Sequence, residues 1–261
     1  PWCVHLSYIK PHWPYVAPAP YHALYDAGDV QPAIRDPIEL KDPHPVYAAY
    51  RRREESQSFS RDIVRETVIP VYMGLVHQID DQIGRLMTFL EARGDLDNTM
   101  IVFTSDHGDY LGDHWLGDKE LFHRQSVRIP LIVVDPDPAA DATRGTVSTA
   151  PVEAIDLVPT FVDWLGGAVP DHILEGRSLL PLLRGDTPPW RDTVFSELDY
   201  SFRQQRRDLG LPPHAARAYA MRDDRWNFVF HERFPPQLFD LTNDPGELVD
   251  LGRDPGYAPV C

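Results

Sequence analysis

A carboxylate, an imidazole and a glycine stand together just after an apolar run, and these residues have the clearest capacity for chemistry in the sequence. Residues 100–103 are Met-Ile-Val-Phe, which have the length and β-branched content of a strand buried on both faces. Asp106, His107 and Gly108 follow almost at once. Because side chains alternate along a strand, a turn is needed to bring Asp106 and His107 to one point. Gly108 is expected to supply the backbone freedom of that turn.

A carboxylate and an imidazole at the carboxyl end of a buried parallel strand suit a divalent cation. The alternative from these residues alone is that Asp106 caps a helix and His107 is only hydrogen-bonded. The residues that follow favour a site, because 111–119 form a glycine-punctuated polar loop that ends in Lys119. A second apolar strand is expected at 131–134, and polar loops between core strands are where sites are built.

The order of these motifs resembles the sulfatase family of the alkaline phosphatase superfamily. The shared pattern is a strand, Ser-Asp-His-Gly, Leu-Gly-Asp-His, a lysine and then Arg-Ile-Pro-Leu. Over nearly the whole chain the sequence is most similar to the phosphonate monoester hydrolase branch and its arylsulfatase relatives. The resemblance implies that Asp106 and His107 bind one divalent metal ion and that Lys119 contacts a sulfuryl or phosphoryl oxygen. Ca²⁺ or Mn²⁺ is expected first, although one carboxylate and one imidazole do not by themselves exclude Mg²⁺ or Zn²⁺.

His12 is the second candidate catalytic histidine. Two prolines flank it, and because proline fixes its own φ and restricts the preceding residue, they predict a stiff, extended backbone after a strand at residues 2–8. From the residues alone, His12 is expected to stack on Trp13. The resemblance implies instead that His12 protonates the leaving group or binds the ester oxygen. Lys10 is either a second cation there or a solvated lysine.

The nucleophile of the family is missing from this sequence. Sulfatases use a formylglycine made from Cys or Ser in a Cys/Ser-x-Pro-x-Arg motif near an N-terminal Asp-Asp metal element, and neither motif is present. Neither Cys3 nor Cys261 is followed by proline and arginine at the required positions. We therefore expect the C-terminal portion of a longer hydrolase of sulfate or phosphonate/phosphate monoesters or diesters. Its nucleophile is expected upstream, and this portion alone is expected to be inactive.

Two other functions stay open. One is a two-metal phosphodiesterase of the same superfamily, which needs a further histidine ligand, and for which His172 and His214 are available in ordinary contexts. The other is a non-catalytic, degenerate member or a metal-stabilised interaction module, which fits the missing nucleophile. His12 and Lys119 argue against that second alternative, since a purely structural metal site needs neither.

Composition limits the partners. With 40 acidic and 25 basic residues and a formal net charge of −15, the surface is expected to repel nucleic acid and anionic membranes. The expected partner is a small-molecule sulfate or phosphonate ester held by local positive charge, and a homo-oligomer is left open. Two cysteines give no disulfide framework, so the cytoplasm is the default location. No apolar run is long enough to span a bilayer.

The expected fold class is α/β: a sulfatase-like, mixed but mostly parallel sheet flanked by helices, with a smaller antiparallel C-terminal subdomain. The expected domains are 1–185 and 186–261, the latter truncated. Apolar residues at intervals of three and four over 63–90 predict a helix packed on the sheet, which Pro70 starts or kinks and Gly94 ends. The composition of residues 15–60 predicts an irregular segment with short helices. Three consecutive arginines (51–53) are expected to form a solvated helix face there.

The C-terminal part is expected to contain a helix capped by Asp156 and then short antiparallel strands. The strands are predicted at 193–198, 218–222, 226–230 and 238–241. A signature at residues 238–247 matches the family pattern Leu-Tyr/Phe-Asp-Leu-x-x-Asp-Pro-x-Glu. Its acidic residues, Asp240, Asp244 and Glu247, are expected to stabilise turns rather than to take part in chemistry.

Overall fold

The computed structural model describes residues 2–261, which divide into two units that interleave along the chain. The first unit holds residues 2–35, 51–97 and 109–118, and the second holds residues 36–50, 98–108 and 119–261. The division into domains 1–185 and 186–261 stays a prediction.

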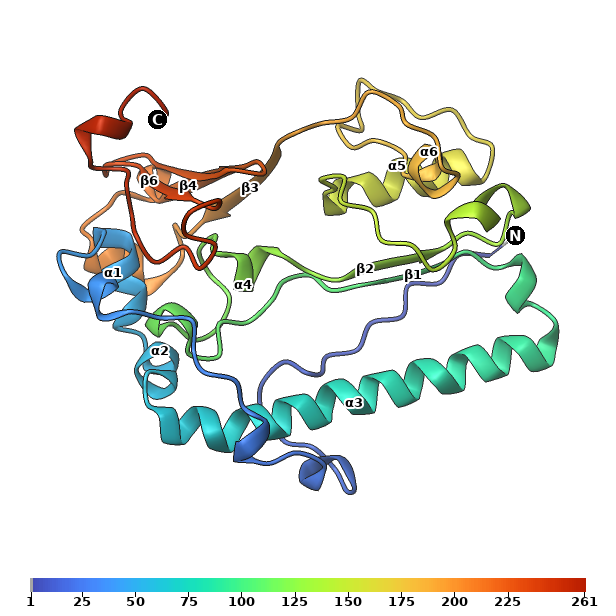
Figure 1. The fold of residues 1–261 in the computed structure, drawn as a ribbon, viewed down its shortest axis with the longest axis horizontal. Helices are drawn as coiled ribbons and strands as arrows, with labels where there is room; N and C mark the ends of the chain where they lie inside the picture. The colour runs from blue at the N-terminus through green and yellow to red at the C-terminus, as the bar shows by residue number, and fades with distance from the viewer. Residues whose placement is uncertain (1) are drawn as a thin grey trace. The chain divides into compact units, whose positions relative to one another are not determined.

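Helices and strands follow in the order shown in Figure 1. The α-helices are α1 (Pro45–Arg51), α2 (Glu54–Phe59), α3 (Asp62–Arg93), α4 (Arg124–Val127), α5 (Leu157–Trp164), α6 (Leu180–Leu183) and α7 (Gln204–Asp208). The strands are β1 (Ile101–Thr104), β2 (Leu131–Val134), β3 (Val194–Asp199), β4 (Arg217–Arg222), β5 (Trp226–His231) and β6 (Gln237–Asp240). The 3₁₀ helices η1 (Tyr21–Ala23), η2 (Ala27–Asp29) and η3 (Pro37–Leu40) lie in the region predicted to hold short helices.

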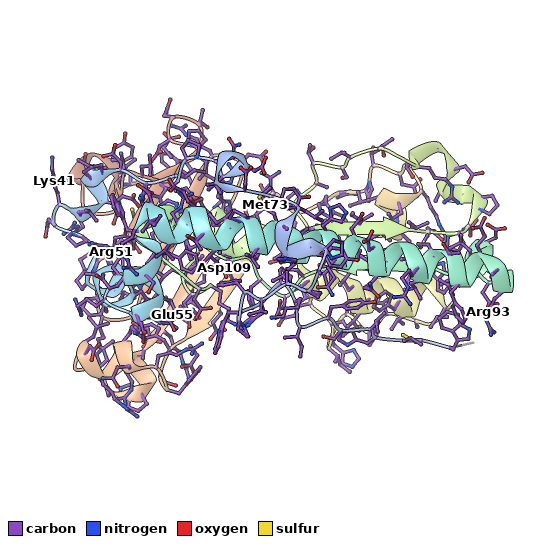
Figure 2. The ribbon with its side chains drawn as sticks, turned by 90° about the horizontal axis from the view of Figure 1, so that it is seen from below. Lys41, Arg51, Glu55, Met73, Arg93 and Asp109 are labelled. Atoms are coloured by element: carbon purple, nitrogen blue, oxygen red, sulfur yellow. The ribbon has the colours of Figure 1, made fainter. Side chains whose placement is uncertain are left out.

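The longest element, α3, runs without interruption through Pro70. Figure 2 shows the helix lengthwise, with Met73 near its middle and Arg93 at its end. Proline removes only one i→i−4 hydrogen bond, and here the ring is buried, so the turns on both sides maintain the helix. Gly94 ends it with a φ of 72°, as predicted. Within residues 2–261 no helix combines the length and apolar character needed to cross a membrane.

Gly74, inside α3, allows this helix to approach η1 closely, a contact that the sequence pattern does not reveal. A Cβ placed on Gly74 would lie 2.1 Å from the backbone oxygen of Tyr21 in η1, so only glycine fits. Leu75 beside it is fully buried, and α3 packs against η1 and η2 within the first unit. The predicted packing of α3 on a sheet stays a prediction.

The strand predicted at residues 100–103 forms as β1, but its neighbour differs from expectation. β1 pairs with β2 in antiparallel register, with Ile101 opposite Val134 and Thr104 opposite Leu131. The described residues contain no parallel pair, and β1 is partly exposed rather than buried on both faces. A run of apolar residues shows that a strand can be buried, but it does not specify the direction of its neighbours.

The strand predicted at residues 2–8 is not formed. This segment has no strand hydrogen bonding, and Trp2, Val4 and Leu6 are all exposed. A strand requires a hydrogen-bonding neighbour as well as apolar residues, and the segment pairs with none in the described part of the chain.

The antiparallel C-terminal sheet is confirmed. β3, β4, β5 and β6 pair in that order, each antiparallel to the next, and each lies within one residue or so of its predicted position. The turn between β4 and β5 is closed by Asp223, whose carboxylate accepts from the backbone N–H of Arg225 and Trp226 at 2.7 and 2.6 Å.

Asp156 does not cap α5, contrary to the prediction. Its side chain makes no capping bond to that helix; it accepts two hydrogen bonds from the guanidinium of Arg191, both at 2.6 Å, and one from the backbone N–H of Arg177. The carboxylate is fully buried, and the bidentate pair raises the pKa of Arg191. Cap chemistry is local, whereas this partner lies 35 residues away.

Glu247, in the C-terminal signature, is a fully buried charge with partners from distant segments. Its carboxylate accepts from the guanidinium of Arg222 at 2.8 Å and from the side-chain amide of Asn227 at 2.7 Å. It also accepts from the backbone N–H of Arg124 at 2.9 Å. Asp240 and Asp244 stabilise turns as predicted, but Glu247 joins the C-terminal signature to α4.

Two buried histidines stack face to face in the second unit. The ring centroids of His44 and His231 lie 4.2 Å apart with an interplanar angle of 29°. His44 bonds the carbonyl oxygen of Pro235, and His231 bonds the side-chain oxygen of Gln237. Burial and the proximity of His44 lower the pKa of His231 to about 3, and burial lowers the pKa of His44. Both rings are therefore neutral near pH 7.

Replacing Glu247 with glutamine is expected to lower the free energy of unfolding by about 3–5 kcal/mol. The reason is that Arg222, whose side chain is 25% exposed, would lose its counter-ion, and an amide N–H₂ would be buried facing other donors. The measurement is denaturant unfolding of the whole protein, with the exposed Glu175→Gln as control, expected to change stability by less than about 0.5 kcal/mol. Similar losses of stability in both variants would contradict a special contribution of the buried Glu247 carboxylate.

Stability is expected to fall as the pH decreases below about 6.5. The unfolded chain binds a proton at position 231 below that pH, whereas the folded chain resists it until about pH 3, so the unfolded state is favoured within that window. Between pH 7 and pH 5 the wild-type protein is expected to lose about 2 kcal/mol more than His231→Leu. The control, His214→Gln at an exposed position, should retain the wild-type dependence of stability on pH. If the stability of His231→Leu changes with pH in parallel with that of wild type, His231 is not the source of the pH dependence.

Candidate active site

The Asp106–His107 turn (residues 105–108) directly follows β1 and brings its two candidate ligands together. The backbone N–H of His107 donates to the Asp106 carboxylate at 3.1 Å, and the Ser105 hydroxyl donates to the carbonyl oxygen of His107 at 2.6 Å. The other carboxylate oxygen of Asp106 lies 3.4 Å from Nε2 of His107. The predicted convergence of these two side chains is therefore seen in the structure.

The tautomer of His107 is set by its neighbour. Nδ1 lies 2.7 Å from the carbonyl oxygen of Gly108, which can only accept, so Nδ1 carries the proton. In the neutral ring the lone pair is then on Nε2, the atom that faces Asp106. Histidine ligands of metals commonly have this backbone bond at the other nitrogen.

The spacing of the two groups fits shared coordination. A separation of 3.4 Å is long for a hydrogen bond but suits two ligands that each lie about 2.1 Å from one ion. The side chain of Asp106 is 87% exposed, and that of His107 is 28% exposed. Within residues 2–261 no group of three or more His, Cys, Asp or Glu could hold a metal. Asp106 and His107 would thus supply two donor atoms to a divalent cation.

Gly108 is required for a different reason from the one predicted. Its φ is not in the left-handed region; instead its backbone lies against the chain just before β2. Its N–H donates to the carbonyl oxygen of Ser126 at 2.8 Å, and a Cβ at this position would lie 1.8 Å from the carbonyl oxygen of Gln125. Glycine is needed here because there is no room for a side chain.

Lys119 begins the Lys119 loop (residues 119–126), which belongs to the same unit as the Asp106–His107 turn. Its carbonyl oxygen accepts a hydrogen bond from the hydroxyl of Ser126. The next residue, Glu120, is buried and forms an ion pair with Arg203 at 2.7 Å. The backbone of Lys119 is therefore held on its carbonyl side by these contacts, and no sequence pattern predicted Ser126 or Arg203.

His12 lies in the first unit, in a turn rather than in extended backbone. Its N–H donates to the carbonyl oxygen of Ile9 at 3.1 Å, and its Nδ1 lies 3.0 Å from the carbonyl oxygen of Trp13. The His12 and Trp13 rings are tilted by 33° with centroids 6.1 Å apart, so they touch without stacking face to face. Lys10 donates to the carbonyl oxygens of His12 and Pro14, which makes it a support of this turn.

Two polar contacts in the first unit hold the loop that precedes Lys119. The hydroxyl of Tyr15 donates to Asp109 at 2.7 Å; burial, and then the Asp109 charge, raise the pKa of Tyr15, which keeps it a donor. Arg53 donates to Asp118 at 2.9 Å and is largely buried, so it is not part of a solvated helix face as predicted. These pairs lie 94 and 65 residues apart in sequence, beyond the reach of local patterns.

Comparison with known proteins identifies the family. The family model described as Sulfatase matches residues 1–168, and a model described as N-sulphoglucosamine sulphohydrolase, C-terminal, matches residues 112–261. The multifunctional alkaline phosphatase superfamily protein PehA of Trinickia caryophylli is 36% identical over 276 residues, covering 100% of this chain and 53% of PehA. A choline-sulfatase of Rhizobium meliloti (strain 1021) is 30% identical over 261 residues, covering 98% of this chain and 47% of that protein.

A solved structure supports the same family. Phosphonate monoester hydrolase SpPMH from Silicibacter pomeroyi superposes with a TM-score of 0.89 at 35% identity, covering 99% of this chain and 53% of that one. The chain therefore spans about half the length of the relatives it matches. The sulfatase-like α/β fold with its antiparallel C-terminal part is confirmed. On the family match and the structural superposition together, this chain belongs to the sulfatase family.

Proposed function

We propose that this chain is part of a metal-dependent hydrolase of sulfate or phosphonate/phosphate esters. The observation that carries the proposal is the Asp106–His107 turn, in which a backbone bond sets the tautomer of His107 and directs Nε2 toward the Asp106 carboxylate. The names of its relatives, a choline-sulfatase and a phosphonate monoester hydrolase among them, support these ester classes.

Asp106 and His107 are the residues of this chain that would hold the ion, and Ca²⁺ or Mn²⁺ is proposed. A bound divalent cation would stabilise negative charge on the ester oxygens and lower the pKa of an attacking hydroxyl. The protein contributes the orientation of the two ligands, because each side chain has a hydrogen bond to the backbone of the turn.

Lys119 is proposed to contact a sulfuryl or phosphoryl oxygen, where its ammonium group would stabilise the charge that develops in the transition state. His12 is proposed to donate a proton to the leaving oxygen. No nucleophile is assigned within this chain, because the Cys/Ser-x-Pro-x-Arg motif is absent from residues 1–261 and the two cysteines, Cys3 and Cys261, lack its context.

The proposed partner is a small ester with one tetrahedral anionic group. Sulfate and phosphonate esters share this shape, so both classes are proposed as substrates. With a net charge of −15, the protein attracts such an anion only through local positive groups, which is the role given to the metal ion and Lys119.

A cytoplasmic location is proposed because the cysteines are free, exposed thiols.

In the whole protein, His107→Ala and Asp106→Asn are each expected to lower bound metal and to reduce turnover of 4-nitrophenyl sulfate and 4-nitrophenyl phenylphosphonate by more than about 100-fold. The reason is the loss of one of two adjacent ligands. Metal content is measured by elemental mass spectrometry and turnover by nitrophenol release.

The matched controls are Asp224→Asn and His172→Ala, which remove the same groups at exposed positions. Both should retain metal and activity. Normal metal content and turnover in the His107 variant would disprove the assignment, and loss of a second ion in His172→Ala would favour a two-metal phosphodiesterase.

His12→Ala is expected to slow esters with poor leaving groups more than activated ones. A phenoxide or alkoxide leaving group needs the proton that His12 supplies, whereas 4-nitrophenoxide leaves without it. The measurement compares kcat/KM for 4-nitrophenyl and unsubstituted phenyl esters in wild type, His12→Ala and the exposed His22→Ala. A loss of equal size on both esters would remove the general-acid role.

A further inference from the structure

Ser126 contacts both parts of the candidate site that lie in the second unit. Its hydroxyl donates to the carbonyl oxygen of Lys119, and its own carbonyl oxygen accepts from the N–H of Gly108 at 2.8 Å. The residue is 5% exposed. A single buried serine therefore joins the backbone of the Asp106–His107 turn to the backbone of the Lys119 loop.

The Lys119 loop needs such contacts because its backbone is unfavourable by itself. Leu121 in this loop and Asp118, the residue just before it, have φ values of 82° and 65°, in the left-handed region that residues with a Cβ rarely adopt. Such angles persist only where surrounding contacts impose them. Glu120 with Arg203, and Glu247 with the N–H of Arg124, hold the other side of the loop.

The two bonds of Ser126 can be separated by substitution. The bond to Gly108 uses the serine backbone and survives replacement of the side chain, whereas the bond to Lys119 uses the hydroxyl. Removing the hydroxyl should thus leave the Asp106–His107 turn in place and release the backbone of Lys119.

We infer that Ser126 is a positioning residue, which fixes Lys119 relative to the Asp106–His107 pair through its hydroxyl. The inference rests on the proposed function, since it gives Ser126 its effect through Lys119. Ser126 acts on the transition state only by holding Lys119 where the oxygens of the transferred group develop charge.

The test is Ser126→Ala in the whole protein, with 4-nitrophenyl sulfate and 4-nitrophenyl phenylphosphonate as substrates. We expect kcat to fall by about 10- to 100-fold, because a displacement of about 1 Å can cost that much, while metal content stays at the wild-type level. In a Lys119→Ala background the same change should alter kcat by less than about 2-fold, because the group it positions is gone.

The matched control is Ser178→Ala, which removes a serine hydroxyl bonded to Asp163 at 2.6 Å, away from the candidate residues in sequence. It should leave kcat unchanged. A purely structural effect of Ser126 would be additive with Lys119→Ala and would also lower metal content. Either result, or a wild-type kcat in Ser126→Ala, would overturn the inference.

Failure of the proposed function can be distinguished from failure of the inference about Ser126. It would appear as a wild-type protein that binds metal but hydrolyses neither ester. Hydrogen exchange of the whole protein then still tests Ser126: amides of residues 117–121 should exchange faster in Ser126→Ala than in wild type or Ser178→Ala. Equal exchange in all three proteins would refute the positioning role.

Discussion

The close approach of Gly108 to the chain at residues 125–126 is the contact on which the candidate site depends. The β1–β2 ladder ends where Thr104 faces Leu131, and the N–H of Gly108 then bonds the carbonyl oxygen of Ser126, so the two segments stay joined beyond the strands. This bond requires a backbone without a side chain, because a Cβ would overlap the oxygen of Gln125. The Asp106–His107 turn is thereby held at both ends, by the β1–β2 ladder before it and by the Gly108–Ser126 bond after it.

A buried charge connects the C-terminal sheet to the same region. Glu247 lies in a turn after β6, yet it accepts the backbone N–H of Arg124, and Asn227 on β5 donates both to Glu247 and to the carbonyl oxygen of Phe122. A carboxylate without contact to water is tolerated only when its hydrogen bonds are satisfied, as they are here. The C-terminal sheet thus holds the Lys119 loop, which gives the family signature a structural connection to the residues proposed for chemistry.

The loop before Lys119 is held by polar contacts to distant segments as well as by its own turn hydrogen bonds. Tyr15 binds Asp109, and Arg53 binds Asp118, so each end of this loop is tied to another part of the first unit. Bonds to charged partners at 2.7–2.9 Å are stronger than neutral ones. They add to the loop's own backbone bonds, such as the one from the N–H of Tyr110 to the carbonyl oxygen of Asp118 at 2.9 Å.

The sequence by itself determined the elements with strong local signals. α3 and the four C-terminal strands follow from periodicity and turn residues, and the turn that joins Asp106 to His107 follows from their place after an apolar run. Only the tertiary structure decided the antiparallel partner of β1, the lack of a partner for residues 2–8, and the contacts of Ser126 and Glu247. Periodicity reports which face of a segment is apolar, because that depends on neighbours along the chain. Pairing direction and buried polar contacts depend on segments tens of residues away, so no local pattern encodes them.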